Sequence, residues 1–373
     1  MMRLLVAGGG TAGHVHPAVA VIEELRRRYG DAQIGYVGSR TGIERQIVAR
    51  LDGVRYYPIL ARGTGNGGLL ARFAAAAVLL AGMVQALVVF ARFRPRVVFG
   101  TGGYASAAPV LLGALLGRFL PLRTVIHEQN VVPGLANRLL GRVVDTVLVS
   151  FRETTAHFAA SRRVVITGNP VRAQLGSARR DRSTYRSLGL DPDKRTVLVF
   201  GGSKGSHALV AAAVRAAKEG GGLQVLLLTG ERVDARRLED ALRRAGVENL
   251  VAWTYLERMD RAFAVADLVV CRAGATTLAE LATCGKPAVL IPWRGAAGDH
   301  QMENALLMHH ARACELAEEP AIRSGDLGAL VRQIVGDEGR LQQMSRSALT
   351  LGMRDAALLV LGELTTPAGG VRC

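Results

Sequence analysis

Two glycine-rich segments have the residue types and spacing that bind a phosphate group. Residues 8–17 read GGGTAGHVHP after the apolar run 4–7, and residues 201–206 read GGSKGS after the apolar run 196–200. A glycine-rich turn between a strand and a helix lets backbone N–H groups and the positive end of the helix dipole approach an anion. Neither segment is a P-loop or a GxGxxG turn with a correctly spaced acid. The pair therefore predicts nucleotide binding and does not favour ATP hydrolysis or NAD chemistry.

Further polar loops follow strand-like runs in both halves of the chain. The first half has GTGGYAS at 100–106 and HEQN at 127–130, and the second half has RAGATTLAE at 272–280 and DHQMEN at 299–304. Ligands of open α/β sheets bind at the carboxyl ends of the strands. Any one loop could be ordinary turn chemistry, but the loops of one half together predict a composite site for a polar or phosphorylated group.

Four side chains within these loops suggest specific chemistry. His14 follows the first glycine turn and can act as a general base near neutral pH, although its position also fits a phosphate ligand or a loop cap. His127 has a comparable claim and His16 a weaker one. Glu280 lies about one turn inside a helix, where its carboxylate suits the two hydroxyls of a ribose. A carboxylate favoured there by the helix dipole is the alternative.

The elements that must position these residues alternate along the chain. Apolar runs predict strands, and longer periodic stretches predict helices. The strands are expected at 4–7, 33–37, 97–100, 124–127, 146–149, 196–200, 224–229, 250–254, 268–271 and 288–292. The helices are expected at 15–29, 42–51, 71–93, 206–218, 234–245, 259–265, 276–284, 301–311, 327–335, 341–351 and 355–364. This alternation predicts an α/β fold with parallel sheets and helices on both faces.

The chain length and a polar segment predict two domains. A chain of 373 residues is long for one domain. Asn169-Pro170 is a turn signal, and residues 177–193 are polar and charged. We therefore expect one domain over 1–171 and a second over 172–352, with the C-terminal tail 353–373 packing back on the first.

Charge and composition narrow the class of partner. The net charge is +16, and residues 1–171 hold 20 Arg and 8 Asp plus Glu, which gives +12 for that half. This excess predicts an anionic partner, a membrane surface or a nucleic acid. Nucleic acid is disfavoured because no recognition motif is present and aromatic residues are only 5%. The four cysteines lack metal-site or CxxC spacing and the N-terminus lacks a signal peptide, so a cytosolic protein is expected.

The segment 73–91 contains no charged residue and is long enough to be considered as a transmembrane helix. Its alanines, Gly82 and Gln85, and the strand-like run that follows favour a buried crossover helix. The alternative is a helix with one apolar face toward lipid, flanked by arginines. The two interpretations are compatible if one face packs on the domain and the other meets a bilayer.

The order and spacing of these motifs resemble one family. The motifs are GGGTAGHVHP, GTGGYAS, HEQN followed by VVPGLANR, TGNPVR, GGSKGS, RAGATTLAE and DHQMENA. Together they resemble the MurG family of bacterial peptidoglycan N-acetylglucosaminyltransferases over essentially the whole chain. The resemblance implies a GT-B fold, with two Rossmann-like domains whose parallel sheets face each other across a cleft. It also implies an inverting transfer of GlcNAc from UDP-GlcNAc to the C4 hydroxyl of the muramoyl sugar of lipid I, giving lipid II and UDP.

The resemblance assigns site residues in both domains. His14 and Glu128 are the implied catalytic residues, with His14 the favoured base. The implied donor site consists of Thr11, Ala12, Gly13, Asn130, Arg172, Ser203, Leu256, Ala275, Thr276, Thr277, Leu278, Ala279, Glu280, His300 and Gln301. The implied acceptor site consists of Gly102, Gly103 and Tyr104. No cofactor and no essential metal are expected.

The expected partners are UDP-GlcNAc, lipid I, an anionic cytoplasmic membrane surface and other cell-wall synthesis proteins, but not a nucleic acid. The expected location is the cytoplasmic face of the plasma membrane, as a peripheral protein that is neither secreted nor transmembrane. Ala12 stands where the family usually has glycine, and His300 stands where some members have glutamine. The alternatives are another GT-B glycolipid transferase, a sugar-nucleotide epimerase and a non-catalytic UDP-sugar-binding scaffold.

Overall fold

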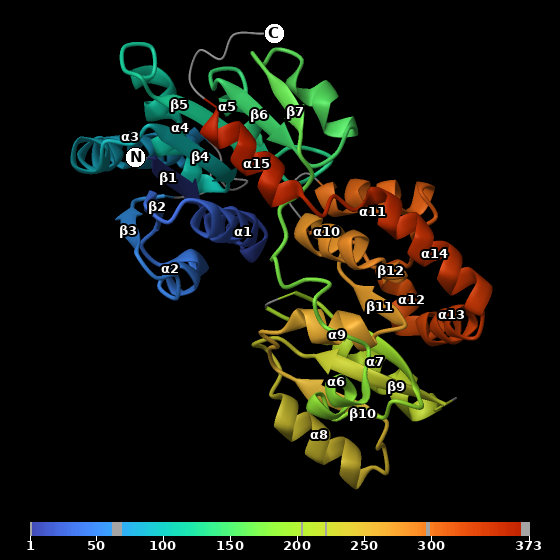
Figure 1. Ribbon diagram of the computed structural model, residues 1–373. Helices are drawn as coiled ribbons and strands as arrows, with labels where there is room; N and C mark the ends of the chain where they lie inside the picture. Colours follow the sequence, from blue (N-terminus) through green and yellow to red (C-terminus); the bar gives the residue numbers. More distant parts are fainter. Residues whose placement is uncertain (1, 62–68, 203, 221, 296–298, 367–373) are drawn as a thin grey trace. The chain divides into compact units, whose positions relative to one another are not determined.

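The chain forms two compact units, each built on one parallel sheet (Figure 1). The computed structural model describes residues 2–61, 69–202, 204–220, 222–295 and 299–366. One unit comprises Met1–Ala173 with Arg354–Cys373, and the other comprises Gln174–Met353. The predicted α/β class with two Rossmann-like sheets is confirmed.

The sheet of the first unit contains seven parallel strands in the order β3-β2-β1-β4-β5-β6-β7. The strands are β1 (Arg3–Gly8), β2 (Gln33–Ser39), β3 (Val54–Ile59), β4 (Val97–Gly102), β5 (Arg123–Glu128), β6 (Thr146–Val149) and β7 (Val164–Ile166). Side chains alternate across β1: Leu5 and Ala7 pack into one core layer, while Leu4 and Val6 pack into the other. Both faces are therefore covered, which explains the continuous apolar runs.

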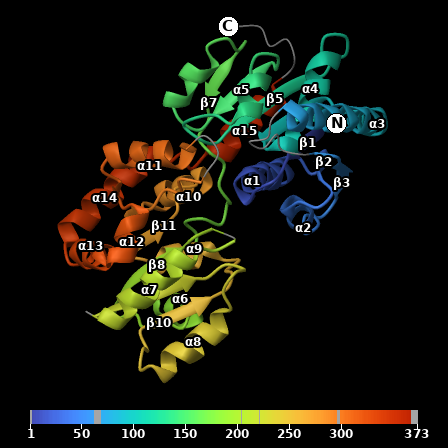
Figure 2. The same cartoon turned by 180° about the vertical axis from the view of Figure 1, so that it is seen from behind.

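Helices cover the two faces of this sheet. They are α1 (Ala12–Arg28), α2 (Ile43–Val48), α3 (Leu69–Phe93), α4 (Tyr104–Leu116), α5 (Leu135–Leu140) and α15 (Ala356–Thr365), with a 3₁₀ turn at Glu153–Phe158. Figures 1 and 2 show α15 beside α1, although the two are far apart in sequence. Leu361 and Leu364 of α15 enter the core layer of Leu4. Arg123 of β5 donates to Glu363 O at 2.6 Å and Thr366 O at 3.0 Å, which satisfies carbonyls at the end of α15.

Helix α3 has one packed face and one exposed apolar face. Ala86, Val89 and Phe90 are buried against the sheet, whereas Val84 is 66% exposed and Leu87 51% exposed. Residues Phe73–Phe93 are long and apolar enough to cross a membrane, and 22% of that apolar stretch is buried. The predicted crossover helix between two strands is present, but the prediction that it is buried is wrong for its outer face, which the described part of the chain leaves uncovered.

The second unit repeats the design with six parallel strands in the order β10-β9-β8-β11-β12-β13. The strands are β8 (Arg195–Phe200), β9 (Leu223–Leu228), β10 (Leu250–Trp253), β11 (Leu268–Cys271), β12 (Ala288–Leu290) and β13 (Cys314–Leu316). The helices are α6 (Arg182–Ser187), α7 (His207–Glu219), α8 (Ala235–Arg244), α9 (Met259–Val265), α10 (Ala275–Cys284), α11 (His300–His310), α12 (Glu319–Ser324), α13 (Asp326–Val335) and α14 (Glu338–Leu351). Their apolar faces form one core layer on each side of the sheet.

Several elements lie outside the ranges expected from the sequence, among them β3, β13 and α6. The edge strands β3 and β13 pair with only one neighbour each, and β3 contains Pro58, a residue that sheets accept at their edges. Helix α6 lies inside the polar segment 177–193, and its N-cap is Asp181, whose side chain accepts from Thr184 N at 2.8 Å. Short edge strands and short capped helices carry too little periodicity to stand out from turns.

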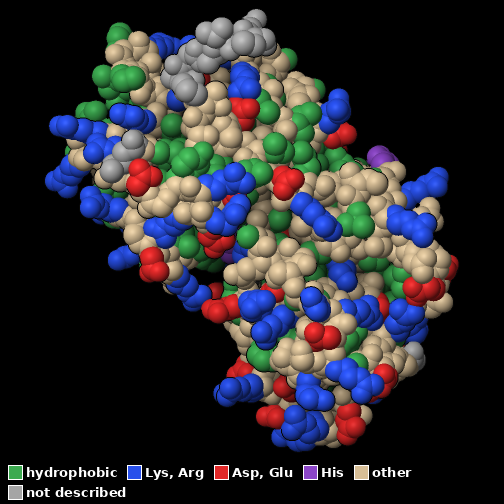
Figure 3. Space-filling model, in the orientation of Figure 1, with side chains coloured by type: hydrophobic (Ala, Val, Ile, Leu, Met, Phe, Trp, Pro, Cys, Tyr) green, Lys and Arg blue, Asp and Glu red, His purple; other side chains and the backbone are tan. Residues whose placement is uncertain are grey.

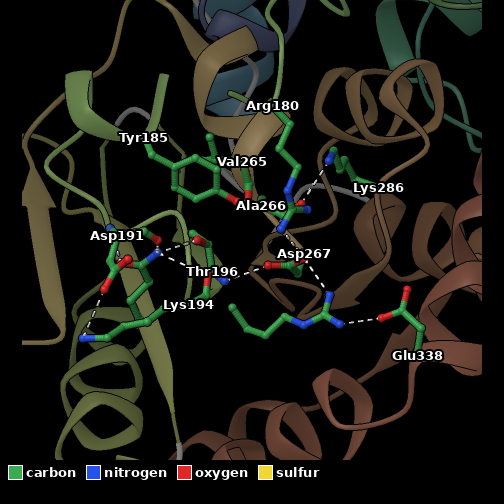
Figure 4. Close-up of polar contacts among 12 residues, drawn as sticks. Arg180, Tyr185, Asp191, Lys194, Thr196, Val265, Ala266, Asp267, Lys286 and Glu338 are labelled. Atoms are coloured by element: carbon green, nitrogen blue, oxygen red, sulfur yellow. Dashed lines mark hydrogen bonds and ion pairs between the residues drawn. The ribbon is translucent and has the colours of Figure 1, made fainter. Parts of the chain in front are cut away.

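A buried carboxylate ties together the amino-terminal ends of two strands in the second unit (Figure 4). Asp267 accepts hydrogen bonds from Thr196 N at 2.8 Å, Arg180 Nη2 at 2.8 Å and Arg195 Nη1 at 3.1 Å. Nearby, Lys286 donates to Ala266 O at 2.9 Å. Burial and the positive charge of Arg180 lower the pKa of Lys286 to about 8. This network lies at the opposite strand ends from the ligand loops, so it supports the fold.

Candidate functional site

The loops after β1 and β4 interlock where the strand order of the first sheet reverses. Gly8 pairs with Gly102 in the sheet. A β-carbon at Gly103 would lie 2.0 Å from Gly9 O, and Gly102 and Gly103 have φ of 95° and 77°. Only glycine fits such a close approach at these dihedral angles. A reversal point of this kind is where open α/β sheets bind ligands, so the predicted glycine loops form one edge of a site.

Glu44 holds the first glycine loop in place through hydrogen bonds. Its buried carboxylate accepts from Gly10 N at 3.2 Å and from Ser39 N and Oγ at 2.8 and 2.6 Å. A β-carbon at Gly9 would lie 2.4 Å from Glu44 Oε1. The N–H of Gly10 is therefore engaged within the protein, and the sequence motifs did not single out Glu44. The sequence separation between Glu44 and the glycine loop does not indicate this contact, because the contact depends on β1 and β2 being neighbours in the sheet.

His14 lies in the first turn of α1 and faces the loop after β5. Thr11 is the extended N-cap of α1, and Ala12 is its first residue. Alanine is a favourable residue at such a helical position. His14 N donates to Thr11 O at 3.1 Å, and His14 Nδ1 lies 3.0 Å from Gln129 Oε1.

Gln129 is a buried link between His14 and His127. Its amide nitrogen lies 2.9 Å from Thr101 O, 3.0 Å from His127 Nδ1 and 3.0 Å from His127 O. His127 Nε2 lies 2.9 Å from Gly168 O. Burial lowers the pKa of His127 to about 4, so this ring is neutral near pH 7. The sequence motifs did not single out Gln129 as a site residue.

Glu128 organises the HEQN loop. Its carboxylate is buried and accepts four hydrogen bonds: Oε1 from Asn130 N and Nδ2, both at 3.0 Å, and Oε2 from Gly134 N at 3.2 Å and Asn137 Nδ2 at 2.9 Å. These donors occupy both oxygens. The geometry assigns Glu128 a positioning role, and the catalytic role implied by the resemblance stays a prediction. Asn130, a predicted donor-site residue, is held by the same carboxylate.

Tyr104 and Arg172 complete the predicted residues of the first unit. Tyr104 begins α4 directly after Gly103 and is half-exposed. Arg172 is partly buried, and its positive charge adds to burial in lowering the pKa of His16 to about 4. Asn169, in the same turn as Arg172, has a buried amide with no hydrogen-bond partner among the described residues. A buried amide without a partner in the protein is unusual.

The second unit has an equivalent edge where its strand order reverses between β8 and β11. A β-carbon at Gly205, in the loop after β8, would lie 2.1 Å from Thr229 O. Ser206 then caps α7. The predicted donor-site residue Ser203 lies outside the described residues, so its placement stays a prediction.

Arg272 is a cation at this edge that the prediction omitted. Its guanidinium donates to Ile291 O at 3.1 Å and Ser206 Oγ at 3.3 Å, and it forms an ion pair with Glu319. The side chain therefore joins the loops after β8 and β11 beside the glycine-rich turn. It lies next to the amino terminus of α7, where free N–H groups and the helix dipole favour an anion.

Helix α10 carries the predicted nucleotide residues Ala275 through Glu280. Gly274 is its extended N-cap, and Thr276 and Thr277 are partly exposed in the first turn. Leu278 is buried in the core, so its side chain supports the helix. Glu280 is 6% exposed, and the ribose role implied for it stays a prediction.

The remaining predicted donor residues lie at the ends of β10 and β12. Leu256 is partly buried and packs on the core. His300 begins α11, and Gln301 Oε1 accepts from Trp293 N at 3.0 Å, which ties this helix to the segment after β12. The structure thus brings the first-half residues together at one edge of the first sheet and the second-half residues at the corresponding edge of the second.

Comparison with known proteins agrees with this architecture. Residues 4–149 match the glycosyltransferase family 28 N-terminal domain, and residues 196–360 match the glycosyltransferase family 28 C-terminal domain. Among solved structures, the MurG of Acinetobacter baumannii is similar, with a TM-score of 0.75, 26% identity, and coverage of 98% of this chain and 99% of that one. A UDP-GlcNAc 2-epimerase from Neisseria meningitidis has a TM-score of 0.68 at 12% identity over 97% of this chain and 99% of that one, a likeness of fold alone.

Curated relatives share much more sequence. A UDP-N-acetylglucosamine–N-acetylmuramyl-(pentapeptide) pyrophosphoryl-undecaprenol N-acetylglucosamine transferase from Geobacter sp. (strain M21) is 37% identical over 369 residues, which is 98% of this chain and 96% of the relative. The enzyme of the same name from Halothermothrix orenii is 38% identical over 94% of this chain and 95% of the relative. This chain therefore belongs to the MurG family of UDP-GlcNAc-dependent N-acetylglucosaminyltransferases.

Proposed function

We propose that this enzyme transfers GlcNAc from UDP-GlcNAc to the C4 hydroxyl of the muramoyl sugar of lipid I, giving lipid II and UDP. Full-length similarity to transferases named for this reaction supports the proposal. The observation that carries it within the structure is His14, held by Gln129 at the reversal point of the first sheet. The product belongs to peptidoglycan synthesis, and hence to cell-wall growth, cell shape and division.

The proposed reaction is a single displacement. His14 takes the proton of the acceptor hydroxyl, and the resulting oxygen forms a bond to C1 of GlcNAc from the face opposite the leaving group. The bond between C1 and the diphosphate oxygen breaks, and its electron pair leaves with UDP. General-base catalysis and electrostatic stabilisation of the leaving group are the two contributions required.

The second unit supplies groups suited to the leaving diphosphate. Arg272 and the N–H groups at the start of α7 and α10 lie at the carboxyl edge of its sheet. Helix amino termini and cations stabilise developing negative charge on phosphate oxygens. We expect no divalent metal requirement, and unchanged transfer in the presence of a chelator would test this.

The exposed face of α3 supports a membrane-associated location. Its exposed apolar side chains are Phe73, Leu80, Val84, Leu87 and Val88, and Phe119 after α4 is 87% exposed. Arg92, Arg94 and Arg96 at the end of α3 are exposed as well. Figure 3 shows basic side chains beside apolar ones on the first unit. An apolar face bordered by arginines fits the interface of an anionic bilayer, where the lipid tail of the acceptor lies.

Transfer is tested with the purified protein, radiolabelled UDP-GlcNAc and a lipid I analogue. Acceptor-dependent label in the lipid product supports the proposal, and His14→Ala should abolish transfer while UDP binding persists. The exposed His157 of the same unit provides a matched control, His157→Ala, which should transfer normally. UDP binding without transfer to lipid I would favour another acceptor or a scaffold.

Membrane association is tested by sedimentation with anionic vesicles. The double substitution Leu80→Glu and Val84→Glu should abolish co-sedimentation and leave transfer to a water-soluble acceptor analogue unchanged. Leu359→Glu, at an exposed leucine of α15, is the control for adding charge to an apolar surface position. Vesicle binding unaltered by the double substitution would rule out α3 as the docking face.

A further inference from the structure

The orientation of the Gln129 amide is determined by its surroundings. One end of the amide lies 2.9 Å from Thr101 O and 3.0 Å from His127 O. Backbone carbonyl oxygens only accept hydrogen bonds, so this end must be the NH₂ group. The other end, 3.0 Å from His14 Nδ1, is therefore the carbonyl oxygen Oε1.

His127 agrees with this orientation independently. Its Nε2 lies 2.9 Å from Gly168 O, another carbonyl that only accepts, so Nε2 carries the proton. Burial keeps the ring neutral by lowering its pKa to about 4. Nδ1 of His127 then has a lone pair, and it lies 3.0 Å from the Gln129 NH₂ group, whose two hydrogens are shared among this nitrogen and the Thr101 and His127 carbonyls.

The same reasoning extends to His14. Gln129 Oε1 can only accept, and it meets His14 at Nδ1. In both the charged and the neutral ring, Nδ1 must carry a proton to make this bond. Loss of the second proton therefore leaves the lone pair on Nε2.

We propose that Gln129 is a positioning residue that selects the Nδ1–H tautomer of His14 and so makes Nε2 the basic nitrogen. The chain of donors runs from His14 Nδ1 to Gln129 Oε1, from Gln129 Nε2 to the Thr101 and His127 carbonyls, and from His127 Nε2 to Gly168 O. A neutral amide here performs the tautomer selection that a carboxylate performs in a Ser-His-Asp triad.

The chemical consequence rests on the proposed function. The proton of the acceptor hydroxyl moves to His14 Nε2, and the Nδ1 proton stays in its bond to Gln129. Gly102 leaves room for this ring, because a β-carbon there would lie 3.0 Å from His14 Nδ1. The loops after β4 and β5 thus contact the His14 ring on its Nδ1 side, and Nε2 on the other side is the nitrogen available for the reaction.

The tautomer is measured on the full chain without substrates. Long-range ¹H–¹⁵N correlation spectra of ¹⁵N-histidine-labelled protein, recorded at about pH 8.5 where an ordinary imidazole is neutral, distinguish a protonated ring nitrogen from one with a lone pair. The His14 signals are assigned by their absence from His14→Gln. A protonated Nδ1 and an unprotonated Nε2 are expected, and a protonated Nε2 overturns the proposal.

Gln129→Met tests the cause, since methionine has a similar length and its thioether sulfur is only a weak acceptor for Nδ1–H. The His14 ring should shift toward the Nε2–H tautomer, and kcat should fall at least about tenfold, because general-base catalysis contributes about 10²- to 10⁴-fold. The KM for UDP-GlcNAc should change less than about twofold. Gln46→Met, at an exposed glutamine of the same unit, is the matched control and should change neither quantity.

Persistence of the Nδ1–H tautomer in Gln129→Met also overturns the proposal. If that variant fails to fold, the spectrum of the unmodified chain decides by itself. A chain that shows no transfer activity while His14 has the expected tautomer refutes the proposed function and leaves the role of Gln129 supported, so the two failures are distinguishable.

Discussion

Replacing Glu128 by glutamine exchanges one oxygen of a carboxylate that holds the loop after β5 for an NH₂ group. Each oxygen now accepts from two N–H donors: Oε1 from the backbone and side chain of Asn130, and Oε2 from Gly134 N and Asn137 Nδ2. Either orientation of a glutamine amide places its NH₂ group against two donors. Two hydrogen bonds are therefore lost and their donors are left facing another donor.

The expected cost follows from these contacts. A lost hydrogen bond to a charged group costs about 1.5–3 kcal/mol. The lower value applies because Asn130 is only partly buried and Gly134 is exposed, so water can solvate part of what is lost. Two bonds at about 1.5 kcal/mol each predict that Glu128→Gln lowers the free energy of unfolding by about 3 kcal/mol. The loop should lose order before the rest of the unit.

Amide hydrogen exchange and urea unfolding measure the two parts of this prediction. The N–H groups of Asn130 and Gly134 should be protected in the unmodified protein and exchange much faster in Glu128→Gln. Glu153→Gln, at an exposed glutamate of the same unit, is the control and should alter neither measurement. Loss of turnover with unchanged amide protection and unchanged unfolding free energy would refute the positioning role and favour direct participation of Glu128 in the chemistry.

Three further predictions concern stability and donor binding. His16 and His127 have pKa values lowered to about 4 in the folded protein. In the unfolded chain the same two histidines bind protons from about pH 6.5 downward. The free energy of unfolding measured with urea should therefore fall as the pH drops from about 6.5 to about 4. A pH-independent free energy of unfolding over that range would contradict these shifts. Asp267→Asn should lower the free energy of unfolding by about 1 kcal/mol, because the arginine partners of Asp267 are half-exposed. Asp267→Ala should lower it by about 3 kcal/mol, because the buried N–H of Thr196 loses its acceptor. Equal urea midpoints for the two variants would contradict this reasoning. Glu280→Ala should raise the KM for UDP-GlcNAc more than it lowers kcat, and an unchanged KM in steady-state kinetics would exclude the ribose assignment.

Apolar exposure on α3 could not be derived from composition. The segment 73–91 is apolar apart from Gln85, so both a buried helix and a lipid-facing helix were consistent with it. The structure separates the two faces: Val89 and Phe90 pack on the sheet, while Val84 and Leu87 point outward. The rotation of a helix about its axis depends on its neighbours, and a stretch whose single polar residue is Gln85 has too weak a pattern to reveal it.

The sequence by itself determined the class of fold and the positions of the glycine loops. Continuous apolar runs are sufficient to predict buried parallel strands, and glycines such as Gly102 and Gly103 mark turns because their φ values of 95° and 77° disfavour other residues. The ordered motifs carried the family resemblance that the comparisons confirmed. These signals are local, so they can be identified before the strands are placed in order.

Tertiary structure alone decided which side chains support the site. Gln129 lies 115 residues from His14, and Glu44 lies 34 residues from Gly10. Each pair meets because strand order brings different loops to the same edge of the sheet. No local periodicity records that order, and the direction of a hydrogen bond depends on which carbonyls surround a buried amide. The roles assigned to Gln129, Glu44 and Glu128 therefore come from the fold.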